Sequence, residues 1–138
     1  MSVIVAVLVV TMVVLGELGL ITVRMTAVID DDRRVLTSLA NLLASGGYGT
    51  RAYESALDFF SEGYSGLVCV ITDLGMRPID GIQVLDRTVH SDTATPVIVI
   101  TGKPSEHTED YYLQRGALGF FRKPVDGDAL LDLLDSIA

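Results

Sequence analysis

Acidic side chains stand at the ends of two apolar segments, and they are the residues best suited to metal or phosphoryl chemistry. Asp30 and Asp31 follow the short run 27–29, and Asp73 ends the β-branched run 68–72. Apolar runs that stop at a carboxylate and then break into turn residues are typical of buried strands. Asp73 alone would equally suit a helix cap or a turn. Its interpretation therefore depends on which other residues reach the same edge.

Three carboxylates at one edge would repel each other, by roughly 1 to 4 kcal/mol for a pair a few ångströms apart, and so require a cation. Oxygen ligands without His or Cys favour Mg²⁺, with Mn²⁺ as an alternative. Thr101 and Lys123 follow two later apolar runs and supply a hydroxyl and a positive charge. Positioning and charge neutralisation are most of what phosphoryl transfer requires. Asp73, in the middle strand of the group, is the candidate nucleophile, which would yield an acyl phosphate.

The elements that must position these residues alternate between strands and helices. Strands are expected at about 25–29, 48–53, 67–73, 97–100 and 116–122, and helices at about 33–45, 55–63, 81–90, 106–115 and 126–137. Five strands alternating with five helices over short loops predict an α/β fold, a doubly wound parallel sheet with helices on both faces, in three layers. Ligands of such sheets bind beyond the carboxyl ends of the strands, where all five candidate residues are expected.

Polar residues mark the starts of three of these helices. Asp32 is expected to cap the first helix, Ser55 the second with Asp58 at its third position, and Ser105 the polar helix that follows the fourth strand. A capping role for Asp32 leaves Asp30 and Asp31 for another purpose.

Composition limits the domain count and the class of partner. The chain has 138 residues and a formal net charge of −8, enough length for one domain with a real core. The acidic balance disfavours direct nucleic-acid binding, which requires a positive surface. The single cysteine, Cys69, excludes an intrachain disulfide and suits a reducing cytoplasm. We therefore expect one cytoplasmic domain over residues 25–138.

Residues 1–24 form a hydrophobic leader that we expect to lie outside the domain core. Val, Ile, Leu and Met dominate this segment, and Glu17 is the only ionisable side chain before Arg24. Its length would suffice for a membrane span, which would attach the protein to the inner membrane. However, almost no linker separates Arg24 from the first strand, and Met25 is a plausible initiator. A start-site extension, a membrane anchor and a segment that packs on the domain or mediates association all remain open.

From Met25 to the end, the sequence resembles the receiver domain of two-component response regulators. Its acidic pair, phosphoacceptor, hydroxyl residue and Lys-Pro dipeptide stand in the family order, at Asp30-Asp31, Asp73, Thr101 and Lys123-Pro124. The resemblance implies a flavodoxin-like (βα)5 fold with strand order 2-1-3-4-5. It also implies that Asp31, Asp73 and the backbone carbonyl of Gly75 ligate Mg²⁺ directly, while Asp30 acts mainly through water. Phe120 falls at the family's aromatic switch position.

The resemblance implies a signalling switch rather than an enzyme. A sensor histidine kinase would donate the phosphoryl group of its phosphohistidine to Asp73, and Thr101 and Phe120 would then move. This movement would reshape the face built from the receiver's fourth helix, with Tyr111 and Tyr112, its fifth strand and its last helix. The partner at this face would be an unidentified downstream protein or a second copy.

Two other functions are alternatives to a phosphorylated switch. A receiver fold that signals without phosphorylation, with or without a membrane tether, would not need the acids, Thr101 and Lys123 together. A phosphohydrolase of the haloacid dehalogenase type would need an acid two residues after the nucleophile, where this chain has Gly75.

The departures from the family pattern are modest. Arg77 separates Met76 from Pro78, and Lys103-Pro104 is expected to stiffen the loop after Thr101. The peptide bond before Pro124 is a candidate for the cis form.

Overall fold

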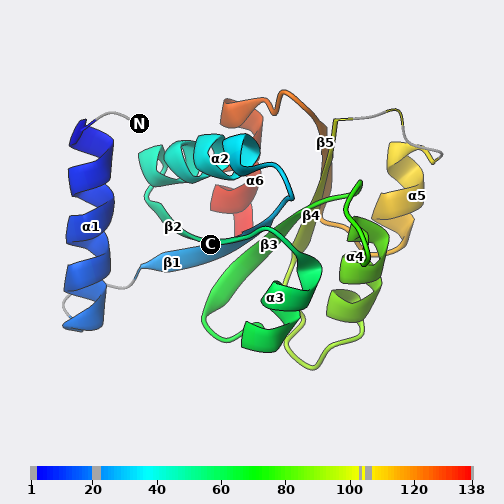
Figure 1. Cartoon of the computed structure of the whole chain (residues 1–138), viewed down its shortest axis with the longest axis horizontal. Coiled ribbons are helices and arrows are strands. Elements are labelled where there is room, and N and C mark those ends of the chain that lie inside the picture. Colours follow the sequence, from blue (N-terminus) through cyan, green and yellow to red (C-terminus); the bar gives the residue numbers. More distant parts are fainter. Residues whose placement is uncertain (1–2, 20–22, 103, 105–106, 138) are drawn as a thin grey trace.

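The computed structural model describes residues 3–19, 23–102, 104 and 107–137, and its centre is a five-stranded parallel sheet (Figure 1). The strands are β1 (Arg24–Ile29), β2 (Tyr48–Tyr53), β3 (Leu67–Asp73), β4 (Val97–Thr101) and β5 (Gly119–Arg122). They lie in the order β2-β1-β3-β4-β5, which confirms the predicted topology. Each strand ends at the same edge, so residues that follow the strands meet there.

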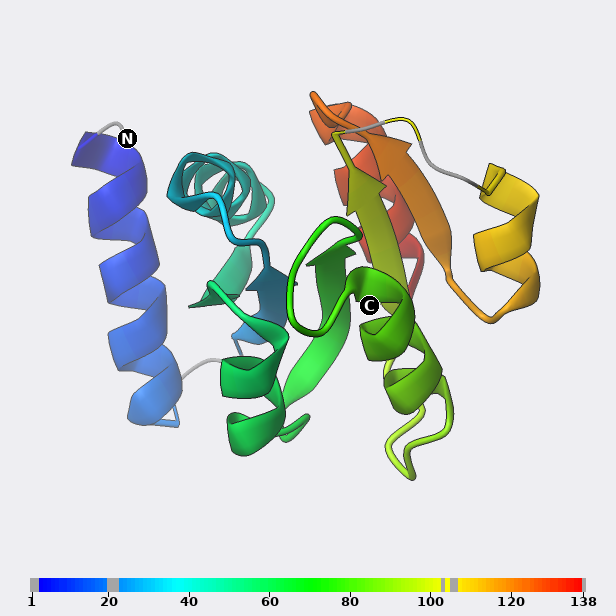
Figure 2. The same ribbon diagram turned by 45° about the vertical axis from the view of Figure 1, so that its right-hand side comes forward.

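Helices cover both faces of the sheet, as predicted. The helices are α2 (Arg33–Ser45), α3 (Ala56–Glu62), α4 (Gly81–Val89), α5 (Glu109–Gln114) and α6 (Gly127–Ile137). Helices α2 and α6 pack on one face, and α3, α4 and α5 pack on the other (Figures 1 and 2). The result is the expected three-layer arrangement.

Alternate residues of the central strands supply the two cores. Ile98 and Ile100 of β4 pack with α2 and α6, whereas Val97 and Val99 pack with α3, α4 and α5. All five residues of β4 are buried, which explains why this segment shows no polar alternation. Fully burying such a side chain contributes roughly 1.5 to 3 kcal/mol, so the sheet is a firm support for the residues at its edge.

The predicted caps of the first two domain helices are present. Asp32 accepts a hydrogen bond from the Arg34 backbone N–H, and Ser55 accepts one from the Asp58 backbone N–H. Asp80 adds a capping box with Gln83 at the start of α4. Because Asp32 serves as a cap, the two preceding aspartates are free of that role.

The start of α5 differs from the prediction. The helix begins at Glu109 rather than at residue 106, because Thr108 has an extended backbone and serves as the N-cap. Glu109 and Asp110 then occupy the first turn, where acidic side chains interact favourably with the helix dipole. The predicted cap Ser105 and the unusual Lys103 lie outside the described residues.

The leader contains a helix, α1 (Val3–Glu17), which lies beside α2 and the edge strand β2 (Figure 1). Met12 and Val13 face Val23, Tyr48 and Gly49 across a small gap. Strand β1 begins at Arg24, so the last residue of the predicted leader already belongs to the sheet. Within the described part of the chain, none of the helices combines the length and hydropathy that crossing a membrane would require.

Candidate functional site

Asp30 lies directly after β1 and is completely buried. Its backbone N–H donates to the Tyr53 carbonyl at 3.0 Å, which ties the strand end to β2. Its Oδ1 accepts a hydrogen bond from the Asp32 backbone N–H at 2.9 Å. Burial raises the pKa of Asp30, although bonds from Lys123 and from the Asp32 N–H oppose that shift. A buried carboxylate of this kind favours a cationic partner.

Asp73 is the last residue of β3 and is 6% exposed. The next residue, Leu74, donates its N–H to the Ile100 carbonyl at 3.0 Å, so the strand end is held against β4. Asp73 Oδ2 accepts from the Gly75 backbone N–H at 3.2 Å. A Cβ atom at Gly81 would lie only 2.2 Å from the Asp73 carbonyl oxygen, so this close approach of α4 requires glycine. The carboxylate is therefore fixed from both sides.

Lys123 follows β5 and connects the two acids. Its Nζ donates to Asp30 Oδ2 at 2.6 Å and lies 3.1 Å from Asp73 Oδ1. Its backbone N–H donates to the Thr101 carbonyl at 2.8 Å, and its peptide bond to Pro124 is cis, the form that the sequence suggested. Burial alone would lower the pKa of Lys123, but the bonds to Asp30 and Asp73 outweigh it and raise this pKa. Lys123 therefore stays charged at neutral pH.

Asp31 completes a cluster of three carboxylates with Asp30 and Asp73. Each offers an oxygen within 4.8 Å of the others, and Asp31 is exposed while its two neighbours are buried. Lys123 offsets one of the three negative charges. Hard oxygen donors at this spacing suit Mg²⁺, which keeps several of its own waters. The residues present thus fit the expected metal, whereas ligation by the Gly75 carbonyl stays a prediction.

Thr101 and Phe120 lie on the neighbouring strands β4 and β5. Thr101 ends β4 and is 5% exposed. Phe120 pairs with Val99 in register and is half-buried, and the guanidinium of Arg122 lies 5.6 Å from its ring centroid. Thr101 therefore borders the carboxylates, while Phe120 sits further back along the sheet.

Tyr112 of α5, which the sequence placed with Tyr111 on the output face, makes a contact that the sequence did not reveal. It is 1% exposed and stacks on Phe120, with the ring centroids 5.4 Å apart and the planes 14° from parallel. Tyr111 beside it is half-buried, so the two tyrosines do not share one role. Phe120 pairs with Val99, which faces α5, and this pairing, which no local sequence pattern gives, accounts for the contact.

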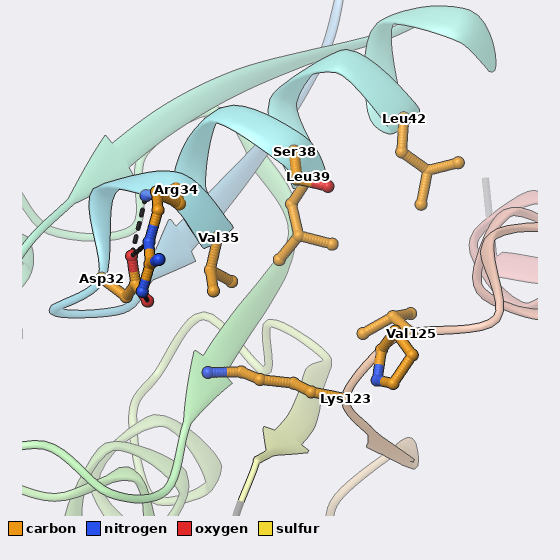
Figure 3. A pocket seen from close by; sticks show the side chains of 9 residues that line it. Asp32, Arg34, Val35, Ser38, Leu39, Leu42, Lys123 and Val125 are labelled. Atoms are coloured by element: carbon orange, nitrogen blue, oxygen red, sulfur yellow. Dashed lines mark hydrogen bonds and ion pairs between the residues drawn. The ribbon is translucent and has the colours of Figure 1, made fainter.

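A groove of about 390 Å³ opens next to Lys123, between α2 and the segment after β5 (Figure 3). Val35, Leu39 and Leu42 of α2 line one side, and Val125 lies opposite. Asp32, Arg34, Ser38 and Pro124 complete the lining. The groove is therefore an apolar surface with the Lys123 ammonium at one end.

Comparison with known proteins identifies the family that the chain resembles. The family model described as "Response regulator receiver domain" matches residues 26–135. The transcriptional regulatory protein FixJ of Bradyrhizobium diazoefficiens is 32% identical over 111 residues, covering 79% of this chain and 54% of that protein. FixJ of Azorhizobium caulinodans is 34% identical over 105 residues, covering 75% and 50%. The chain spans about half the length of these curated relatives.

Solved structures show the same fold. A response regulator receiver domain protein from Clostridium thermocellum is 25% identical, with a TM-score of 0.75 over 83% of this chain and 94% of that one. Chemotaxis protein CheY4 of Vibrio cholerae shares the fold at 18% identity, with a TM-score of 0.73 over 84% of this chain and 99% of that one.

Proposed function

This chain belongs to the response regulator receiver family, and from that membership we propose that it takes a phosphoryl group onto Asp73 from a sensor histidine kinase. An Asp73 carboxylate oxygen forms a bond to phosphorus as the bond from phosphorus to the histidine nitrogen breaks. The electron pair of that bond stays on the imidazole, and Asp73 carries an acyl phosphate. The phosphorylated aspartate is the signal.

The convergence of Asp30, Asp73 and Lys123 is the observation that supports this proposal. Three strands far apart in the sequence bring two buried carboxylates and an ammonium within hydrogen-bond distance. A role in folding alone would not require a third carboxylate, Asp31, within 4.8 Å of the other two. Such concentrated charge suits phosphoryl transfer, where electrostatic stabilisation is the main contribution of the protein.

Each residue of the cluster has a proposed role. Asp30, Asp31 and Asp73, with the Gly75 carbonyl, would hold Mg²⁺, and the bound ion would neutralise phosphoryl oxygens. Lys123 lies within reach of Asp73 and would contact the transferred group with its ammonium. Thr101 would donate its hydroxyl to the same group from the adjacent strand.

The groove beside Lys123 is the surface that we assign to the kinase. Its apolar side chains on α2 give a partner protein a contact that ends at Lys123, whose ammonium is 3.1 Å from Asp73. The face built from α5, β5 and α6 would carry the output through Phe120. Downstream, the partner would be another protein or a second copy; the relatives FixJ and TmoT are named as regulators.

Phosphorylation of the purified chain tests the assignment. Incubation with acetyl phosphate and Mg²⁺ should add one phosphoryl group to the intact mass, and Asp73→Asn should abolish that gain. Asp92→Asn is the matched control, because Asp92 is an exposed aspartate in the loop before β4. Undiminished labelling of Asp73→Asn would overturn the assignment. A wild-type chain that neither gains mass nor binds Mg²⁺ would instead support signalling without phosphorylation.

A further inference from the structure

Helix α1 carries a large uncovered apolar surface. Its exposed side chains, with those of the turn that follows, are Val3, Ile4, Val7, Leu8, Val10, Val13, Val14 and Leu18. These residues are between 37% and 81% exposed, and monomers rarely expose contiguous apolar patches larger than a few hundred Å². A surface of this size indicates a binding partner.

The composition of α1 also indicates that its exposed side is buried against a partner. Thr11 and Glu17 are its only polar side chains, and the Thr11 hydroxyl donates to the Val7 carbonyl of its own helix at 2.8 Å. Helices that are apolar all round are normally buried all round. Valine is also a modest helix former, so a valine-rich helix gains its stability from packing. Burial of the outer face would supply that packing.

The domain covers only one side of α1. Met12 and Val13 approach Val23, Tyr48 and Gly49, and the helix lies beside α2 and β2. Figures 1 and 2 show the opposite side of α1 facing away from the rest of the chain. Among the described residues, the outer side of α1 is therefore left uncovered.

Four exposed valines follow each other at intervals of four, three and four residues, at Val3, Val7, Val10 and Val14. This is the heptad spacing by which two helices pack along a shared seam. A two-fold symmetric contact brings the same patch of both copies together, and an uncharged valine stripe can meet its own copy without charge repulsion. The spacing thus fits a second α1.

The charges of the chain favour a second α1 over a lipid surface as the partner of this helix. Helices that lie on membranes present basic residues on a polar face, and the segment before Arg24 contains no Lys or Arg. The formal net charge of −8 further disfavours an anionic bilayer. The same charge opposes contact between two copies elsewhere on their surfaces, but α1 carries only Glu17. Association through α1 joins the copies where repulsion is weakest.

We propose that two copies of this chain associate through α1, along the stripe of Val3, Val7, Val10 and Val14. The contact is independent of phosphorylation, because α1 lies at the β2 edge of the sheet and Asp73 is at the end of β3. Asp73→Asn should therefore leave association unchanged.

The mass of the full-length chain in solution tests the proposal. Light scattering coupled to size exclusion, over a hundredfold range of concentration, should show a dimer for the wild type. Val7→Glu and Val10→Glu should be monomers with unchanged labelling of Asp73, since both positions are exposed, at 59% and 62%. Leu57→Glu on α3 is the matched control at 53% exposure and should stay dimeric.

Three results would overturn the proposal. The first is a monomeric wild type throughout the range, and the second is a dimer that persists in both seam variants. The third is a wild-type chain that is monomeric in solution and sediments with neutral phosphatidylcholine vesicles, while Val7→Glu does not sediment with them. That third result would assign α1 to a lipid surface.

Discussion

The Lys123 ammonium lies 2.6 Å from Asp30 Oδ2, although the two residues are 93 positions apart in the chain. Asp30 is completely buried and the Lys123 side chain is 22% exposed. The same ammonium is 3.1 Å from Asp73. One cation therefore holds together the ends of β1, β3 and β5 at the proposed site of phosphoryl transfer.

Removing this cation should destabilise the metal-free protein. For Lys123→Met we expect the free energy of unfolding in EDTA to fall by about 2 kcal/mol, below the roughly 3 to 5 kcal/mol of a fully buried pair because Lys123 is partly exposed. Mg²⁺ should recover more stability in this variant than in the wild type. Urea unfolding with and without Mg²⁺ measures both effects. Lys123→Arg keeps the charge, so its free energy of unfolding should fall less than that of Lys123→Met. Equal stability of Lys123→Met and the wild type would contradict the interpretation.

Asp31 offers a direct test of the metal site because it is exposed and its replacement leaves the core intact. Asp31→Asn should weaken Mg²⁺ binding at least tenfold, on the order of 1.4 kcal/mol or more, without lowering metal-free stability. Isothermal titration and thermal unfolding with added Mg²⁺ measure these quantities. Asp32→Asn is the neighbouring control, since asparagine caps a helix as well as aspartate does. Equal Mg²⁺ affinity in both variants would exclude Asp31 as a ligand.

The chain contains no tryptophan, so Phe120→Trp would place a single reporter at the proposed switch. If the ring moves inward on phosphorylation, tryptophan emission should shift to shorter wavelength after acetyl phosphate and Mg²⁺ are added. Phe121→Trp is the control, because Phe121 packs against the other core, with α2 and α6. If the emission of the Phe120→Trp variant does not change on phosphorylation, Phe120 is not part of the switch.

Deprotonation of Tyr48 should lower the free energy of unfolding at alkaline pH. Burial, together with a hydrogen bond to Asp135, raises the pKa of Tyr48 from 10.0 to about 12. The folded state retains this proton longer than the unfolded state, so the contribution is complete below pH 10 and is lost as pH rises toward 12. In urea unfolding at pH 9, 10 and 11, the free energy of unfolding should fall less steeply with pH for Tyr48→Phe than for the wild type. Tyr53 and Cys69, whose pKa values are also raised to about 12, remain in both proteins. Identical slopes would contradict the assignment.

Much of the fold could be predicted because each local pattern agreed with the next. The β-branched runs of β3 and β4 are long enough to indicate buried strands, and Asp32 and Ser55 mark helix starts that the structure confirms. Parallel strands end at one edge of the sheet, so Asp30, Asp73 and Lys123 could be placed near one another from their position in the chain alone. Their convergence follows from topology rather than from local sequence.

Side-chain contacts across elements could not be predicted in the same way. Nothing local distinguishes Tyr112, which is buried on Phe120, from Tyr111, because the difference depends on how α5 packs against β5. The start of α5 at Glu109 depends on the extended conformation of Thr108, and a serine three residues earlier gave a competing signal. The contacts of α1 were also beyond prediction, because a helix that is apolar all round has no periodicity to show which side faces the domain.

Strand β5 is the last of the five to be synthesised, and Lys123 follows it directly. A chain that is still emerging from the ribosome has both carboxylates but no ammonium between them until β5 pairs with β4. The acids of a partly made chain therefore repel each other at the edge of an unfinished sheet. The proposed site is therefore complete only when β5 has paired with β4 and brought Lys123 to the two acids.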